Sequence, residues 1–469
     1  MKTGPGFPDF FSAEAGEPGN FPRWEKWLVL GILAGFVIVA GRVIHNFGWT
    51  AQDIGFHVDC TRQVLANPGR WFFMDLTSRP LLYWTGAACL RLTHSSSGFT
   101  LAATVFSVCG AAALGLLHHS SRRFIPSPIL RCSALAFVAF LPVTVCVTVA
   151  YAADTVALLP FALAAWSLIR AIEAPGQAKT LGYASLAGMA LAVGNFAKAT
   201  FLVLPVAVLV AVLLFSYWKK LPPPKAVFII LLSALAPVLV GAWLTLECKR
   251  ELRDLPPHHT FNWHETGEMT WRSLLLPYSR DGRIFAAPSY RDEAVDSHGK
   301  SYLPLLQPNN YSYPALLHLA VFTDILGVAN TNRDGFGANR PEPEKAAARL
   351  AVASGVVFSL ATLAATILFS LQFIAALVRR KAPPFSLSIW FLFGACWFVP
   401  LVAVLPYVQH AYQWGYWLPR LILPALWCFF LLPFAALGAM PAPLRPRLEL
   451  AAAAVVAIQT AFNVASIWF

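Results

Sequence analysis

Asp53 is the acidic side chain of this sequence best placed for proton-transfer chemistry. It stands just after the first long apolar segment, at the start of a stretch in which Ile54, Val58 and Leu65 recur at helical spacing. His57 follows four residues later and shares a helical face with Asp53. A carboxylate at the edge of a membrane is a candidate general base, because it can accept a proton from a reacting hydroxyl. The structural alternative is an Asp that accepts backbone N–H bonds at a helix start.

The polar residues that follow Asp53 have simpler interpretations. His57 is interpreted as a surface or acceptor-contact residue rather than a metal ligand. Asp59 is expected to pair with Arg62 or Gln63 along the helix, which is a structural role. The stretch as a whole predicts a helix that lies on the membrane surface.

A second short helix is predicted further along this loop. Its apolar run ends at Leu92, is interrupted by Arg91 and is too short to cross a bilayer. We therefore expect it to lie in the membrane interface, with Tyr83 and Trp84 at headgroup depth.

Apart from these two short helices, almost all of the chain is predicted to consist of membrane-spanning segments. Hydrophobic residues make up 57% of the sequence and charged residues 12%, with a mean hydropathy of +0.60, which is far more apolar than a soluble domain. Only helices or closed barrels satisfy the backbone within lipid, and a helical span needs about 20 apolar residues. The predicted fold class is an all-α polytopic membrane protein with about 11 transmembrane helices and with interfacial helices in its first external loop. Its eleven apolar runs are 27–44, 99–117, 129–150, 155–171, 181–196, 200–217, 226–246, 350–377, 385–405, 421–437 and 448–468.

Basic residues in the short connections predict the orientation. They fall on alternate connections, so one assignment makes all of them cytoplasmic. The predicted organisation is a flexible cytoplasmic N-terminus (1–26), a transmembrane core (27–246) with an external loop (46–98), a large external loop (247–349) and C-terminal transmembrane helices (350–469), with the C-terminus outside. These basic residues are Arg23, Lys26, Arg122, Arg123, Lys179, Lys219, Lys220, Lys225, Arg379, Lys381, Arg445 and Arg447.

Charge and cysteine usage exclude several classes of protein. The net charge of +12 is explained by the cytoplasmic anchors and by contact with lipid phosphates, and no dense basic block suits nucleic acid. Eight cysteines without a C-x-x-C pair indicate neither a zinc ribbon nor a disulfide framework. An inverted repeat of the kind that marks many secondary transporters is not evident.

Several motifs follow one another in order around the first external loop. They are the Asp at the exit of the first span, Arg62 and Leu65, the turn at Gly69 and Trp71, and the group Arg79, Pro80, Tyr83 and Trp84. This ordered set resembles the first external loop of the GT-C glycosyltransferases, most of all the lipid A aminoarabinose transferases and the protein O-mannosyltransferases. The similarity continues through Asp154, Lys198 and the segment 417–424.

The resemblance implies a donor, a place of transfer and two site residues. The donor would be a polyprenyl-phosphate-linked sugar, transferred on the external face to a lipid, glycan or protein acceptor. Asp53 corresponds to the catalytic carboxylate and Arg79 to the cation that holds the lipid phosphate. Many relatives have an acidic residue at the position of Ile54 and Tyr at that of His57. These departures leave open whether a divalent metal ion is a cofactor.

The implied reaction suits these residue types. A phosphate is already a good leaving group, so the site needs cations more than a general acid. Arginine engages phosphate oxygens through a planar fork and keeps its charge. A carboxylate can take the proton of the acceptor hydroxyl as it attacks, and one direct in-line attack inverts the anomeric carbon.

Three more ionisable residues stand at the external ends of predicted spans. Asp154 and Lys198 are interpreted either as substrate-binding residues or as a mutual ion pair that stabilises packing. Arg420 precedes the tenth span, where it either contacts phosphate or anchors the helix at the interface.

The large external loop, predicted to be a substrate-facing lid, carries further candidates. Arg280 and Arg283 are interpreted as second phosphate contacts, with pairing to Asp281 or Asp292 as the alternative. Four residues have metal-ligand chemistry without a recognised spacing, and solvated loop positions are the alternative for them. They are His258, His259, His264 and Glu265.

Two other functions compete with the enzyme. A flippase or transporter of a lipid-linked glycan would place ionisable groups at mid-bilayer, where these spans are overwhelmingly apolar. A non-catalytic protein of the same fold is favoured by Ile54, where an acid is missing. The short loops and basic turns indicate a bacterial inner membrane, although a protein of the endoplasmic reticulum obeys the same orientation rule.

Overall fold

The computed structural model describes residues 22–47, 54–67, 79–218, 220–252, 317–318, 321–322, 342–379, 384–403 and 411–468, and helices form almost all of this part. The first half of the chain contains α1 (Arg23–Phe47), α2 (Ile54–Ala66), α3 (Leu81–Thr93), α4 (Ser97–Ser121), α5 (Pro128–Ala139), α6 (Pro142–Val149), α7 (Ala153–Glu173) and α8 (Gln177–Ala197). The 3-10 turn η1 (Ala199–Val203), α9 (Leu204–Tyr217), α10 (Pro223–Ile230), the π turn η2 (Leu231–Leu235) and α11 (Ala236–Leu252) follow. The second half contains α14 (Glu342–Arg379), α15 (Phe385–Ala403), α16 (Ala411–Gly438) and α17 (Arg445–Trp468).

Ten of the described helices are long and apolar enough to cross a membrane, or eleven if the bent pair α5 and α6 counts as one span. This confirms the all-α polytopic membrane fold predicted from hydropathy. α10, η2 and α11 together form a single span over Pro223–Arg250, where the sequence predicts one run at 226–246. α14 has 38 residues, so it extends beyond the predicted run 350–377 at both ends.

The predicted run 129–150 is bent rather than straight. α5 and α6 meet at an angle of 56°, because Pro142 is at the first position of α6 and Leu141 before it is extended, with a ψ of 133°. Proline has no N–H to continue a helix, and it pushes the preceding residue out of the helical region. The bend is therefore encoded by Pro142.

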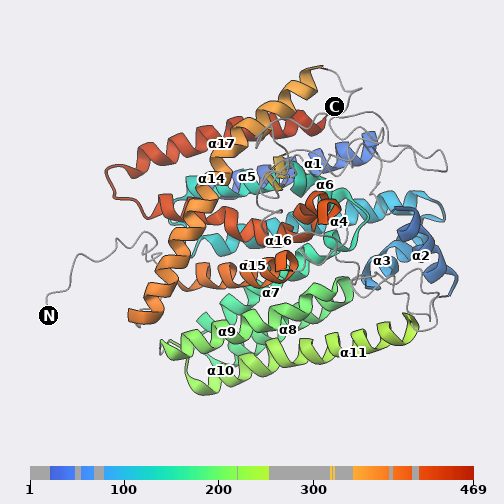
Figure 1. Cartoon of the computed structure of the whole chain (residues 1–469), viewed down its shortest axis with the longest axis horizontal. Coiled ribbons are helices and arrows are strands. Elements are labelled where there is room, and N and C mark those ends of the chain that lie inside the picture. The colour runs from blue at the N-terminus through green and yellow to red at the C-terminus, as the bar shows by residue number, and fades with distance from the viewer. Residues whose placement is uncertain are drawn as a thin grey trace.

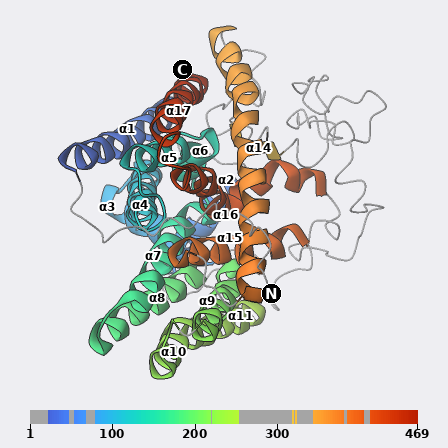
Figure 2. The same ribbon diagram turned by 90° about the vertical axis from the view of Figure 1, so that its left-hand side faces the viewer.

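The helices form one bundle with two short helices at one end. α7 and α8 form an antiparallel hairpin, and α4 packs against α7. α2 packs on α3, and α3 packs against α4 and also contacts α7 and α8 at this end of the bundle (Figure 1). α14 runs obliquely across α15 and α16 (Figures 1 and 2). The loop that carries α2 and α3 is thus positioned by three spans, α4, α7 and α8.

Aromatic rings tie the two halves of the chain together in the core. Phe137 of α5 stacks on Phe358 of α14 with ring centroids 4.1 Å apart. Trp397 of α15 makes edge contacts with Phe161 of α7 and Phe201 of η1, at centroid distances of 5.4 and 5.2 Å. Such offset and edge-to-face pairs stabilise a core beyond the burial of their area. The C-terminal spans therefore pack on the same core as the hairpin that positions α2 and α3.

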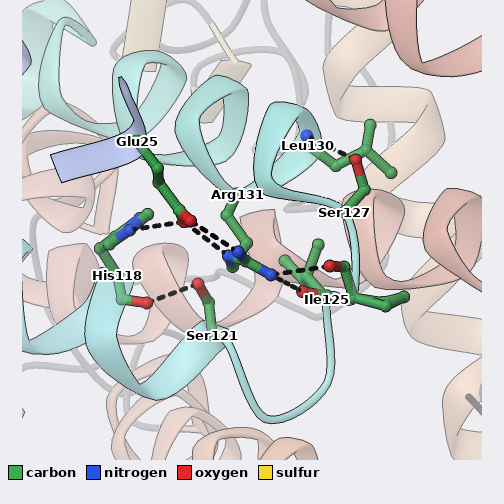
Figure 3. Close-up of polar contacts among 8 residues, drawn as sticks. Glu25, His118, Ser121, Ile125, Ser127, Leu130 and Arg131 are labelled. Atoms are coloured by element: carbon green, nitrogen blue, oxygen red, sulfur yellow. Dashed lines mark hydrogen bonds and ion pairs between the residues drawn. The ribbon is translucent and has the colours of Figure 1, made fainter. Parts of the chain in front are cut away.

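A buried ionic cluster joins α1, α4 and α5 at the opposite end of α1 from α2 (Figure 3). Glu25 is fully buried, and Arg131 Nε and Nη2 donate to its two carboxylate oxygens, each at 2.8 Å. His118 Nε2 lies 3.4 Å from Glu25 Oε1. Arg131 Nη1 also donates to the carbonyls of Ile125 and Pro126, both at 2.8 Å. The bidentate pair fixes the start of α1 on the bundle.

Replacing Glu25 by Gln is expected to lower the free energy of unfolding by about 3–5 kcal/mol, because Arg131 would keep its buried charge and lose its carboxylate. Thermal unfolding of the purified protein in detergent measures this loss. The double variant Glu25→Leu with Arg131→Met removes both charges, so it should unfold at a higher temperature than Glu25→Gln. A Glu25→Gln protein that melts like the wild type would contradict the role of the pair.

Candidate functional site

α2 begins directly after Asp53. Asp53 itself lies outside the described residues, and the first residue of α2 is Ile54. The helix predicted here from periodicity is confirmed, since α2 extends to Ala66. Arg62 Nη1 lies 3.8 Å from Asp59 Oδ1, with both side chains exposed, so the predicted pairing of Asp59 is also confirmed.

The inner face of α2 docks on α3 through polar contacts. His57, interpreted above as a surface or acceptor-contact residue, is only 5% exposed, and its Nδ1 lies 3.2 Å from the Tyr83 hydroxyl on α3. One turn later, Thr61 Oγ1 lies 2.7 Å from the Tyr151 hydroxyl, which donates to the Leu82 carbonyl at 3.2 Å. Burial raises the pKa of Tyr151, so its phenol remains a hydrogen-bond donor. These contacts fix the helix that Asp53 precedes.

Arg79 is buried immediately before α3, with 1% of its surface exposed. Its Nη2 donates to Thr245 Oγ1 on α11 at 3.0 Å. The Thr245 hydroxyl donates in turn to the Gly241 carbonyl at 2.8 Å. Because the hydrogen bond ties the guanidinium to a membrane span, Arg79 is held in one place. A guanidinium carries five N–H donors in a planar fork that matches the oxygens of a phosphate.

Asp154 and Lys198 form a buried ion pair. Lys198 Nζ donates to Asp154 Oδ1, and the two residues are 6% and 5% exposed. Asp154 lies in the first turn of α7, where the helix dipole favours a carboxylate, and Lys198 directly follows the last residue of α8. Of the two interpretations of these residues, the structure shows the mutual pair. It closes the end of the α7–α8 hairpin that faces α3.

Aromatic rings join α3, α8 and α11 near this end of the hairpin. Trp84 of α3 and Phe196 of α8 have ring centroids 5.9 Å apart, and Phe196 and Trp243 of α11 are 6.5 Å apart. Lys198 follows Phe196 by two residues, and Thr245, which accepts the hydrogen bond from Arg79, follows Trp243 by two residues. Arg79, the ion pair and the docked helix α2 therefore lie at the same end of the bundle (Figure 1).

The remaining predicted site residues are not placed by the structure. Arg420 belongs to α16, but its side chain lies outside the described ones. Among the described residues, no group of three or more His, Cys, Asp or Glu could hold a metal ion. All eight cysteines fall within the described ranges, and no disulfide joins any two of them. Outside the described residues lie Arg280, Arg283 and the weak metal candidates His258, His259, His264 and Glu265.

Three hydroxyl residues of this region were missed by sequence reasoning. Thr61 and Tyr151 join α2 to α7 and α3, and Thr245 positions Arg79. Thr245 lies near the outer end of the predicted span 226–246, and Tyr151 lies between the predicted spans 129–150 and 155–171. Polar side chains at the ends of apolar runs are the signal that could have identified these two residues.

Gly86 allows α3 to approach Tyr151 closely. A Cβ at Gly86 would lie 1.8 Å from the Tyr151 hydroxyl oxygen and 2.9 Å from Thr61 Cγ2. Replacing Gly86 by Ala is therefore expected to push α3 outward and to lower the free energy of unfolding by about 1–3 kcal/mol. Gly41→Ala on α1 is the matched control, because no atom lies within 4 Å of a Cβ there. Equal thermal stability of the two variants would contradict this close approach.

Comparison with known protein families finds no match, and comparison with curated sequences finds none either. Among solved structures, the chain is similar to the apo oligosaccharyltransferase of Archaeoglobus fulgidus, with 12% identity and a TM-score of 0.50 over 95% of this chain and 57% of that one. This chain thus spans less than two thirds of that structure. ArnT of Cupriavidus metallidurans, solved with undecaprenyl phosphate bound, has 16% identity and a TM-score of 0.36 over 88% of this chain and 77% of its own. The first similarity shows the fold of the chain.

Proposed function

We propose that this chain, a multi-pass membrane protein with the GT-C fold, is a glycosyltransferase that uses a polyprenyl-phosphate-linked sugar. The acceptor is a lipid, glycan or protein on the external face of a bacterial inner membrane. In this proposal the N-terminus is cytoplasmic, and the end of the bundle that carries α2 and α3 faces outward, following the positive-inside rule.

The observation that supports this function most directly is the buried guanidinium of Arg79. An arginine buried where membrane spans end is costly and marks a functional site by default. Thr245 holds this arginine on α11, so the fork is preorganised and needs little ordering when it binds a phosphate. Its position beside α2 brings a phosphate-binding group to the same loop as the candidate base, Asp53.

The aromatic rings that join α3, α8 and α11 suit the carrier lipid. Trp84, Phe196 and Trp243 form a continuous apolar surface between α3, α8 and α11. Trp243 is 44% exposed on the outside of the bundle, where lipid lies. A polyprenyl chain can therefore run along this surface while its phosphate reaches Arg79, which fits a lipid-linked donor better than a soluble nucleotide sugar.

The reaction is a single displacement at the anomeric carbon. The acceptor hydroxyl oxygen forms the new bond to this carbon while the bond to the carrier phosphate oxygen breaks. That oxygen keeps the electron pair, so polyprenyl phosphate leaves as an anion that Arg79 stabilises. The proton of the hydroxyl passes to Asp53. One such step inverts the configuration of the sugar.

Proteoliposomes that contain the full-length protein test this function against its main rival. The external side is given an extract of cell-envelope acceptors, and the membrane carries undecaprenyl phosphate linked to radiolabelled mannose, glucose or arabinose. A transferase moves label from the lipid into the extract. Label that stays on the lipid but crosses the bilayer at equal rates in wild type and Asp53→Asn would instead identify a flippase.

A further inference from the structure

A second charged site lies at the far end of the α7–α8 hairpin. α7 has 21 residues, so at 1.5 Å per residue its C-terminal end lies about 30 Å from Asp154. There the structure contains a cavity of about 470 Å³ between the end of α7, the start of α8 and the α4–α5 turn. Arg123, Arg170 and Lys179 line it, with Glu173 as the one acidic residue. This end belongs to the face predicted to be cytoplasmic.

The cations of this cavity exceed what Glu173 can neutralise. Arg123 Nη2 lies 3.1 Å from Glu173 Oε2 and Arg170 Nη1 lies 3.9 Å from the same oxygen, so two arginines share one carboxylate. Lys179 is exposed and makes no ion pair with a described residue. Arg170 Nε is buried and donates no hydrogen bond to any described group. The cavity therefore keeps positive charge and donor capacity for an anion.

The arginine at the centre is held in a fixed orientation. The Arg170 guanidinium lies over the ring of Tyr183, 5.4 Å from its centroid, and Trp166 packs against the same ring with centroids 5.8 Å apart. Cation–π stacking leaves the edge of the guanidinium available for hydrogen bonds. A phosphate is the anion that best fits the planar guanidinium groups of Arg123 and Arg170 together with the ammonium of Lys179.

The other wall of the cavity is apolar. Ala174, Pro175, Gly182 and Leu186 complete the lining, and the site lies where membrane spans end. A basic pocket between transmembrane helices, with an apolar wall at headgroup level, is the chemistry that recognises an anionic phospholipid. We infer that this cavity binds the phosphate group of an anionic membrane lipid in the leaflet opposite the candidate transfer site. This inference does not depend on the proposed function.

Binding of phosphatidylglycerol to the purified full-length protein in detergent, followed by native mass spectrometry, tests the inference. Two variants change the cavity in different ways. Gly182→Leu fills it without changing charge, because no atom lies within 4 Å of a Cβ at Gly182, and Arg170→Gln with Lys179→Gln removes two cations. Gly31→Leu on α1, which also meets open space, and Arg447→Gln at the start of α17 are the matched controls.

We expect each cavity variant to raise the Kd for phosphatidylglycerol about tenfold, the double variant because it loses charge-assisted contacts and Gly182→Leu because its side chain occupies the space of the lipid headgroup. The controls should bind as the wild type does. Phosphatidylcholine should bind all five proteins equally.

Competition with excess inorganic phosphate distinguishes a lipid phosphate from a soluble phosphate compound as the anion bound in the cavity. If it displaces the lipid from wild type, a lipid phosphate is recognised; if it binds without any saturable lipid binding, the same cations serve a soluble phosphate compound. Equal lipid binding by all five proteins, together with no binding of phosphate, would overturn the site.

Discussion

Replacing Asp53 by Asn is expected to reduce sugar transfer by about 10²–10⁴-fold, because an amide cannot take the proton of the acceptor hydroxyl. The loss should fall on kcat rather than on KM for the donor, since the carboxylate acts in the transition state. The rate of label transfer by the purified protein in liposomes, at saturating donor, measures it.

Asp59→Asn is the matched control for this prediction. Asp59 follows Asp53 by six residues in the sequence and lies on α2, and its pair with Arg62 is exposed. An exposed ion pair contributes little to stability, so the control should transfer sugar at the wild-type rate. Equal rates for Asp53→Asn and Asp59→Asn would remove Asp53 from the mechanism.

Replacing Arg79 by Gln is expected to lower kcat/KM by about 10²–10³-fold, because the charge that develops on the leaving phosphate loses its main donor. Arg79→Lys should fall between this variant and the wild type, since an ammonium keeps the charge but lacks the planar fork. Steady-state kinetics with an undecaprenyl-phosphate sugar, and binding of undecaprenyl phosphate itself, measure the two losses separately.

The control for Arg79 lies on the helix that follows it. Arg91, in the last turn of α3, is exposed and donates to the Leu65 carbonyl at 3.4 Å. Arg91→Gln should leave both transfer and lipid binding unchanged. Because Arg79 also joins α3 to α11, thermal unfolding must show that its variants are folded. A folded Arg79→Gln protein with wild-type kinetics would contradict its assignment as the phosphate-binding residue.

The membrane spans could be predicted from the sequence because the hydropathy of a segment depends only on its own residues. Each span must be apolar over about 20 residues in any arrangement of its neighbours. The bend at Pro142 was also encoded locally. The extra length of α14 was not predictable in this way, since nothing in hydropathy records how far a helix continues beyond the lipid.

The candidate site could be predicted only in part, because its contacts depend on tertiary packing. Periodicity identified α2 and left His57 as a surface or acceptor-contact residue, but it gave no indication that His57 contacts Tyr83 on α3. The pairing of Asp154 with Lys198 was foreseen as an alternative, because both residues stand at the ends of adjacent spans. The role of Thr245 could not be predicted, since a threonine in an apolar run does not indicate that Arg79, 166 residues away in the sequence, donates a hydrogen bond to it.

The proposed reaction is the transfer of a sugar from a polyprenyl phosphate, with Asp53 as the base. A single-turnover experiment on the purified protein in liposomes tests it most directly, by measuring free undecaprenyl phosphate and labelled acceptor together with the wild type and with Asp53→Asn. If Asp53 is the base, the wild type should release one undecaprenyl phosphate for each sugar that it transfers, and the variant should form neither product on the same timescale. Release of undecaprenyl phosphate at the wild-type rate by Asp53→Asn, or no release by the wild type from any of the three donors, would contradict it.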